Sequence, residues 1–270
     1  MIKIVFCDMD GTLLDENGQM PPMFDEVIAE LKAHNVIFAP SSGRQYSALL
    51  KQMGKYIDDF LFLAENGTFV AQHDKELFSN TLEREDIMRV LDAAEQIPGA
   101  YPVVCGKRLA FITKQWGPYL EGMDQYFTQS KIVEDLHAAV ENEEVIKIAI
   151  SDAERGHAEK NIYPQLQEAV ADPLQVVLSS NYWVDIMNPG VNKGVAVKRV
   201  QQMLGLKPEE CAAFGDYLND SEMLEAVGYG YAMENAHPDV KKIAKYTAPP
   251  NTEYGVMTRL REMMAQGMMG

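Results

Sequence analysis

Hydrophobic positions along the chain follow two repeating patterns, one typical of buried strands and the other typical of amphipathic helices. Residues 2–7 form a continuous, β-branched apolar run, which predicts a strand buried on both faces of a parallel sheet. A helix is predicted just after two prolines, because apolar residues recur there at helical spacing: Phe24, Val27, Ile28 and Leu31. A second strand at 36–40, a second helix at 44–53 and a hairpin turning at Asn66 and Gly67 follow.

The pattern changes between residues 83 and 188. Short apolar runs that predict strands alternate there with helical segments, at 101–105, 108–112, 145–151, 174–179 and 182–187. Repeated strand pairs with intervening helices indicate an α+β unit built on its own antiparallel sheet. After Lys193 the first pattern returns, with a helix that ends at Gly205. We therefore predict an α/β fold, a doubly wound parallel-sheet (Rossmann-like) core at 1–82 and 189–270, with an inserted α+β domain at 83–188.

Composition narrows the range of functions. The 270 residues carry a net charge of −16, which excludes binding to nucleic acid or an anionic membrane through a general basic field. The cysteines Cys7, Cys105 and Cys211 form no CxxC pair, so we expect reduced thiols in a cytoplasmic protein. We find no signal segment and no apolar stretch of about 20 residues, and expect a soluble monomer or small homo-oligomer. The methionine-rich segment at 263–269 is expected to be frayed.

Groups that can carry chemistry follow several of the predicted strands. Asp8 and Asp10 come directly after the first strand, and a Ser-Ser-Gly-Arg segment (41–44) follows the second. Asp216 follows the strand at 211–215, with Asn219 and Asp220 just beyond it. Because ligands of open parallel sheets bind beyond the carboxyl ends of the strands, we expect these groups to meet at one edge of the sheet.

This set of side chains suits a phosphate ester held together with Mg²⁺. A hard divalent cation prefers carboxylate and carbonyl oxygens, while a hydroxyl, helix-start amides and a lysine bind phosphate oxygens. One aspartate can attack phosphorus, and the other can protonate the leaving alkoxide and later deprotonate water. Asp8 and Asp10, which are separated by one residue, are thus interpreted as a nucleophile and a general acid/base.

The motifs resemble those of a known family. The segment "DMDGTLL" is similar to the DxDGT signature of the haloacid dehalogenase superfamily of phosphatases, and "SSGR", "NKG" and "GDYLND" are similar to its later motifs, in the same order. The insert, together with "AENG", "GVNKG" and "MENAHPDVKKIA", resembles the Cof-like sugar phosphatases, whose inserted domain is a type IIB cap.

This resemblance implies a role for each matching residue. Asp8 would be the nucleophile and Asp10 the general acid/base. Mg²⁺ would be bound by the Asp8 carboxylate, the main-chain carbonyl of Asp10 and Asp216. The phosphate or substrate would be bound by Ser42, Gly43, Arg44, Lys193 and Asn219. Thr12 would hold Asp10 in place, and Asp220 would orient either the metal-bound waters or Lys193.

Other interpretations stay open at this point. Ser41 competes with Ser42 for the phosphate, and Arg44 is equally suited to pairing with a carboxylate. Glu65 and Asn66 are interpreted most simply as the hairpin turn, with a place at the rim of the site as the alternative. A phosphomutase would use the same aspartyl-phosphate on a small phosphate ester, and a receiver-type signalling module or an inactive binding protein would share some of these residues.

Overall fold

The computed structural model describes residues 1–119, 127–154, 156–179 and 181–270, and its chain divides into two compact units. The first unit contains 1–43, 55–77 and 192–270, and the second contains 44–54 and 78–191. The division follows the predicted insertion but lies a few residues away from it, and it places residues 44–54 with the insert. The boundaries 1–82, 83–188 and 189–270 are kept as a proposal.

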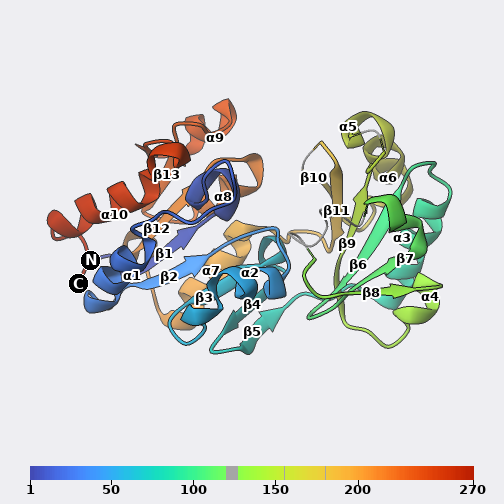
Figure 1. Ribbon diagram of the computed structural model, residues 1–270, viewed down its shortest axis with the longest axis horizontal. Helices are drawn as coiled ribbons and strands as arrows, with labels where there is room; N and C mark the ends of the chain where they lie inside the picture. Colours follow the sequence, from blue (N-terminus) through green and yellow to red (C-terminus); the bar gives the residue numbers. More distant parts are fainter. Residues whose placement is uncertain (120–126, 155, 180) are drawn as a thin grey trace. The chain divides into compact units, whose positions relative to one another are not determined.

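The first unit is built on a parallel sheet (Figure 1). The strands run, in spatial order, as β14 (Tyr246–Ala248), β13 (Tyr229–Met233), β12 (Cys211–Gly215), β1 (Ile4–Cys7) and β2 (Ile37–Pro40). Every residue of β1 is buried, as expected for a continuous apolar strand with neighbours on both sides. The predicted parallel core is therefore confirmed, and β1 lies at its centre, paired with β12 and β2.

Helices of the first unit pack in pairs beside this sheet. The helix α1 (Phe24–Ala33) contacts α10 (Gly255–Ala265), and α7 (Lys193–Leu204) contacts α8 (Ser221–Glu225). The shorter α9 (Pro238–Ile243) follows β13 and contacts α8. The buried residues of α1 are the four that the periodicity predicted, and α7 ends at Gly205 with a left-handed φ of 66°.

A three-stranded sheet extends the first unit beyond β2. The strands β3 (Leu61–Ala64) and β4 (Phe69–Gln72) form the predicted antiparallel hairpin, and β5 (Lys75–Ser79) is an additional strand beside β4. Ser41, just after β2, bridges to Leu63 in parallel orientation. The turn at Glu65–Gly67 consequently lies at the same end of the strands as the residues that follow β1 and β2.

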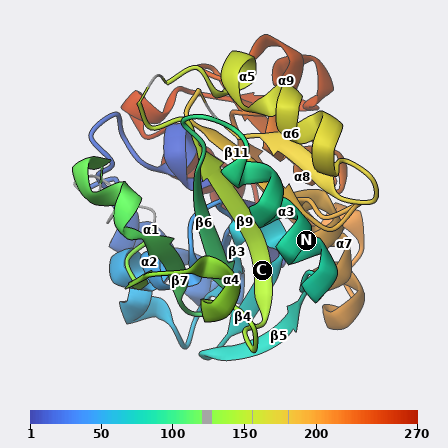
Figure 2. The ribbon, with the colours of Figure 1, turned by 90° about the vertical axis from the view of Figure 1, so that its right-hand side faces the viewer.

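The second unit has a six-stranded sheet covered by helices on one face (Figure 2). The spatial order is β10 (Gln175–Leu178), β11 (Trp183–Met187), β9 (Val145–Ser151), β6 (Tyr101–Gly106), β7 (Ala110–Thr113) and β8 (Ser130–Val133). All neighbouring strands are antiparallel except β7 and β8, which are parallel. Strand β8 was not predicted from the sequence. Of the helical segments predicted between these strands, the one after β7 includes a short helical turn at Lys114–Tyr119, and residues 120–126 lie outside the described residues.

The helices of the second unit are α2 (Tyr46–Met53), α3 (Arg84–Glu95), α4 (Leu136–Ala139), α5 (Ala158–Asn161) and α6 (Tyr163–Val170). The apolar face of α3 is buried in one hydrophobic core with Ile148 and Ile150 of β9. At the base of this unit, Asn188 Nδ2 donates to Asn80 Oδ1 at 2.6 Å and to the Thr81 carbonyl at 2.7 Å. The segments that lead into and out of the predicted insert are therefore hydrogen-bonded to each other.

The two termini lie side by side (Figure 1), which corrects one expectation. Met269 pairs with Ile2 as an isolated bridge, and the Ile2 amide donates to the Met268 carbonyl at 2.7 Å. Met263 and Met269 are buried. The methionine-rich end is thus packed on the core rather than frayed, because Met263 and Met269 are buried and Met269 pairs with Ile2, just before β1. No helix within the described ranges is long and apolar enough to cross a membrane.

Candidate active site

The parallel sheet brings the predicted site residues of the first unit to one edge. Cys7, the last residue of β1, is level with Phe214 on β12 and with Pro40 on β2. Asp8, Ser41 and Asp216 therefore leave three adjacent strands at nearly the same height. The carboxyl ends of parallel strands form the usual ligand-binding edge of such a sheet.

A buried ammonium group joins two of the aspartates. Lys193 Nζ lies 2.5 Å from Asp8 Oδ1 and 2.7 Å from Asp220 Oδ1, and the Lys193 side chain is fully buried. Lys193 is the first residue of α7, whose start is fixed because the Asn192 side chain accepts the Val195 amide at 2.8 Å. The helix start thus aims this lysine at the end of β1, some 185 residues away in sequence.

Asp220 also holds the loop that follows β12. Its Oδ2 accepts the amides of Asp216 and Tyr217 at 2.9 and 3.1 Å, while Oδ1 binds Lys193. Of the two partners foreseen for Asp220, the structure shows contact with Lys193. Asp220 therefore links the lysine of α7 to the loop that carries Asp216.

Asp216 lies against two residues of the turn after β1, Thr12 and Gly11. The Thr12 hydroxyl donates to Asp216 Oδ1 at 2.8 Å, a partner other than the predicted Asp10. Gly11 has φ of +80°, and a Cβ atom there would lie 2.5 Å from Asp216 Oδ2. A side chain at position 11 would therefore collide with this carboxylate, so glycine is required for both conformation and space.

The carboxylates Asp8, Asp216 and Asp220 can each offer an oxygen within 4.8 Å of the others. Burial, together with the negative charge of Asp220, raises the pKa of the Asp8 carboxyl well above its ordinary value. Burial and Asp220 likewise raise the pKa of Asp216 to about 6. Burial alone would lower the pKa of Lys193, but Asp220 and Asp8 outweigh it and raise that pKa, so the ammonium stays charged.

These charges fit a divalent cation. When all three carboxylates are ionised, the single ammonium leaves two negative charges uncompensated in a mostly buried group. Oxygen donors of this kind select hard cations such as Mg²⁺. A cation would also remove the repulsion that raises the pKa values of Asp8 and Asp216.

The remaining predicted residues of the first unit surround this group. Asp10 is exposed and interrupts the helical turn at Met9–Leu13, with φ of −81° and ψ of 119°. Ser42 is buried, and its amide donates to the Leu63 carbonyl at 2.9 Å. Asn219 Nδ2 donates to Asn66 Oδ1 at 3.0 Å, and Asn66 also packs against Gly43.

Asn66 also lies beside these residues, although the sequence did not predict it as one of the site residues. The only local signal was its position after an apolar strand, which was interpreted first as a hairpin turn. Residues 65–67 do form this turn, and the Asn66 side chain also contacts Gly43 and Asn219.

Arg44 belongs to the second unit. Its Nη1 lies 3.3 Å from Gln52 Oε1 on α2. Its predicted contact with the substrate therefore stays a prediction. Cys7 is buried, and burial followed by the charge of Asp8 raises the pKa of its thiol well above the ordinary value. This agrees with a structural thiol rather than a nucleophile.

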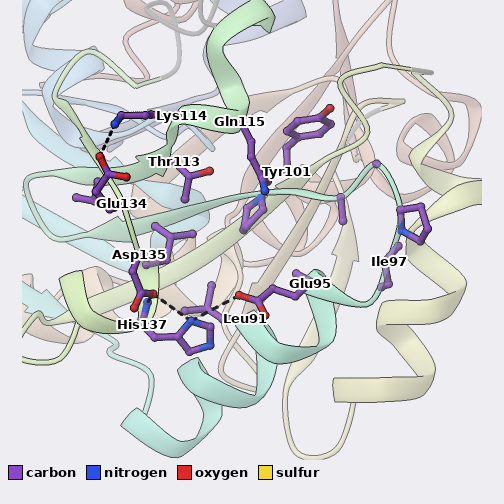
Figure 3. A pocket seen from close by; sticks show the side chains of 17 residues that line it. Leu91, Glu95, Ile97, Tyr101, Thr113, Lys114, Gln115, Glu134, Asp135 and His137 are labelled. Carbon is purple, nitrogen blue, oxygen red and sulfur yellow. Dashed lines mark hydrogen bonds and ion pairs between the residues drawn. The ribbon is translucent and has the colours of Figure 1, made fainter.

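The second unit contains a separate cavity of about 750 Å³ (Figure 3). It lies between the end of α3, the ends of β7 and β8, and α4, and it includes Tyr101, Lys114 and His137. His137 Nε2 lies 3.0 Å from Asp92 Oδ1, and Lys114 pairs with Glu134. Among the described residues that line this cavity, none is a predicted site residue.

Comparison with known proteins gives the family context of this site. The sequence pattern of haloacid dehalogenase-like hydrolases matches residues 5–260. The chain is 29% identical to an Escherichia coli (strain K12) 5-amino-6-(5-phospho-D-ribitylamino)uracil phosphatase, over 95% of this chain and 94% of that protein. It is 27% identical to an HMP-PP phosphatase from E. coli (strain 55989), over 89% and 87% of the two chains.

Solved structures share the fold. A Streptococcus mutans UA159 protein superposes with a TM-score of 0.88 at 24% identity, covering 98% of this chain and all of that one. A sugar phosphatase of subclass IIB of the same superfamily superposes with a TM-score of 0.80 at 20% identity, covering 97% and 98%. At these identities the likeness establishes the fold of the chain.

Proposed function

The chain belongs to the haloacid dehalogenase-like hydrolase family and is a phosphatase, and we propose that it hydrolyses small phosphorylated metabolites, chiefly sugar phosphates, through a phosphorylated Asp8. The observation that carries this proposal is the contact of Asp8 with the buried Lys193, at the carboxyl end of the central strand. A carboxylate held there by an ammonium is positioned as a nucleophile. No other acid of the group directly follows β1.

The proposed reaction has two steps. A carboxylate oxygen of Asp8 attacks phosphorus, the bond from phosphorus to the ester oxygen breaks, and Asp10 gives its proton to the leaving alkoxide. Asp10 then takes a proton from water, and the water oxygen attacks the phosphorus of the phosphorylated Asp8. The bond from phosphorus to the Asp8 oxygen breaks, which releases inorganic phosphate and the free carboxylate. Asp10 is exposed, so an alcohol and a water molecule can both reach it.

The residues that would hold Mg²⁺ are Asp8, Asp216 and the main-chain carbonyl of Asp10. When bound, the cation supplies positive charge that stabilises the phosphate oxygens in the transition state. Lys193 holds Asp8 in its attacking position, and Ser42, Gly43 and Asn219 bind the phosphate oxygens that do not react. Asp220 keeps Lys193 charged and in place.

The substrate class is proposed from the relatives. Those reported above are named for different small phosphorylated compounds, and the subclass IIB structure is a sugar phosphatase. Their names as phosphatases favour transfer of the phosphoryl group to water, and nothing supports the mutase alternative. A monomeric or small oligomeric state and a cytoplasmic location stay predictions from the sequence.

The test is an assay of inorganic phosphate release from a panel of sugar and nucleotide phosphates. The wild type and Asp8→Asn are compared, each with Mg²⁺ and with EDTA. We expect release by the wild type with Mg²⁺, and loss of release with EDTA or in the variant. Equal turnover by Asp8→Asn would refute the mechanism, and release that persists in EDTA would refute the role of the metal.

A further inference from the structure

The turn at Glu65–Gly67 has an unusual backbone. Its residues have φ of +51°, +56° and +90°, so three consecutive residues adopt the left-handed region. Asparagine and glycine tolerate this region, but glutamate rarely adopts it. Such a run persists only where the surrounding structure holds it, and it is often associated with a functional site.

Three segments of the proposed site contact this turn. The Asn66 amide donates to the Ser42 carbonyl at 2.9 Å, and the Asn66 side chain lies so close to Gly43 that a Cβ there would be 3.3 Å from it. Asn66 Oδ1 accepts from Asn219 Nδ2 at 3.0 Å. A Cβ on Gly67 would lie 2.7 Å from Ala196 Cβ and 3.1 Å from the Asn192 carbonyl, so the turn also abuts the first turn of α7.

The Asn66–Asn219 contact determines how the Asn219 amide faces. Because Asn66 presents an acceptor oxygen, the NH₂ end of Asn219 must point toward it. One N–H of Asn219 is then committed to Asn66, and the direction of the second is fixed with it. A fixed donor binds a phosphate oxygen better than a freely rotating one, because less side-chain freedom is lost on binding.

From these contacts we infer that Asn66 is a positioning residue, which acts through Asn219 and aligns that amide with the Gly43 amide to bind the phosphate group of the substrate. The inference rests on the proposed function, since it assigns a phosphate to this edge of the sheet. It does not require Asn66 to touch the substrate. It predicts that the effect of Asn66 vanishes when Asn219 is absent.

The experiment is a double-mutant cycle with Asn66→Gly, Asn219→Ala and the double variant. Glycine keeps the left-handed backbone and removes only the side chain. The readouts are kcat and KM for p-nitrophenyl phosphate with Mg²⁺, and the Kd for inorganic phosphate by calorimetry. We expect each single variant to lose about 10-fold in kcat/KM and in phosphate affinity, and the double variant to be no worse than Asn219→Ala.

Asn35→Gly is the matched control. Asn35 is exposed, has φ of +54° and follows α1, so it undergoes the same substitution in the same backbone conformation away from the site. We expect it to keep wild-type kinetics. If Asn66→Gly does not fold, Asn66→Asp keeps an acceptor oxygen for Asn219, and Asn219→Ala is expected to keep its full effect in that background.

Three results would overturn the inference. They are unchanged kinetics and phosphate affinity in Asn66→Gly, additive losses in the double variant, or an Asn219→Ala effect that is missing from Asn66→Asp. The proposed function fails separately, if the wild type releases no phosphate from any ester. The cycle can then still be run on phosphate binding, and a wild type that does not bind phosphate would overturn the inference as well.

Discussion

Each of the two compact units buries a lysine beside an aspartate. Comparison of the two pairs distinguishes a candidate catalytic group from a structural contact. Lys193 in the first unit is 0% exposed and lies within 2.7 Å of two carboxylates, with a third carboxylate, Asp216, in the same group. Lys147 in the second unit is 3% exposed and lies 3.5 Å from Asp185.

The surroundings of the pairs differ as well. Asp185 on β11 faces Ala149 on β9, so Lys147 is its diagonal neighbour on the same face of the sheet. Within the described parts of the chain, the salt bridge seen for Lys147 is the one to Asp185. The group around Lys193 holds more negative charge than its ammonium can neutralise, which is costly in the folded state unless a ligand is bound. A cluster of three carboxylates around one ammonium therefore distinguishes the candidate site, whereas Lys147 and Asp185 lie side by side on a sheet face, as structural pairs do.

The largest expected effect contrasts the two lysines in activity. Lys193→Met removes the ammonium that holds Asp8, so we expect kcat to fall by about 1,000-fold or more. Lys147→Met is expected to keep kcat within a few-fold for the protein that remains folded. Phosphate release measured on both variants, normalised to the folded fraction, checks this. Comparable losses of kcat would show that the comparison is wrong and that Lys147 belongs to the site.

The second prediction concerns stability, for which we expect a clear loss on replacement of Lys147. Lys147→Met removes the ammonium that lies beside the buried Asp185, and removal of one member of a buried pair costs about 3–5 kcal/mol. The free energy of unfolding from urea titration should show this loss. Lys147→Met/Asp185→Leu is the control, and we expect it to recover most of the stability. A single variant as stable as the wild type would contradict the structural role.

A third prediction concerns pH in EDTA. The pKa of Asp216 is raised to about 6 in the folded protein. Between about pH 4 and 6 this carboxyl is therefore still protonated in the folded protein but ionised in the unfolded chain. The free energy of unfolding therefore falls as the pH rises through that range, by up to about 3 kcal/mol, because the folded protein must then hold the ionised carboxylate. In EDTA at pH 7.5, Asp216→Asn should melt at a higher temperature than the wild type, and at pH 4 the two should agree.

Mg²⁺ should reverse that third result. Addition of the cation at pH 7.5 is expected to raise the melting temperature of the wild type and to have little effect on Asp216→Asn. Asp185→Asn in the second unit is the comparison variant, and it should still respond to Mg²⁺. A wild type that does not respond to the cation would argue against Asp216 as a metal ligand.

The smallest effect compares two helix starts. The Asn192 side chain accepts the Val195 amide at 2.8 Å in the first unit, and Asp135 accepts the His137 amide at 2.9 Å in the second. Loss of either cap in Asn192→Ala or Asp135→Ala should cost about 1 kcal/mol by urea titration. Only Asn192→Ala is expected to lower kcat, by a few-fold, because the next residue is Lys193. Equal kcat in both variants would show that the cap does not position the lysine.

Local patterns in the sequence were sufficient for most of the elements. The spacing of Phe24, Val27, Ile28 and Leu31 predicted the buried face of α1, and Gly205 predicted the end of α7. The strand before Asp8 and the antiparallel unit in the middle of the chain were predicted as well. These features follow from periodicity and from the conformational preferences of single residues, which act over a few positions.

Short elements and distant contacts were not predicted. The strands β5, β8 and β14 carry little local signal, because each is formed through pairing with a neighbour. The end at 263–269 was expected to fray, yet Met269 pairs with Ile2 at the opposite terminus. The short strands and the packed C-terminal end both depend on a pairing partner that is distant in the sequence, so a short stretch of sequence does not predict them.

The sequence by itself determined which chemical groups are present and in what order, namely the acids after two strands, the lysine that opens a helix and the glycine that follows Asp10. Tertiary structure decided which of them meet. It places β1 between β12 and β2, sets Thr12 against Asp216, and brings Asn66 to Asn219 across 153 positions. These contacts arise from strand order and from a left-handed turn, both of which are fixed by the packing of the whole unit rather than by neighbours along the chain.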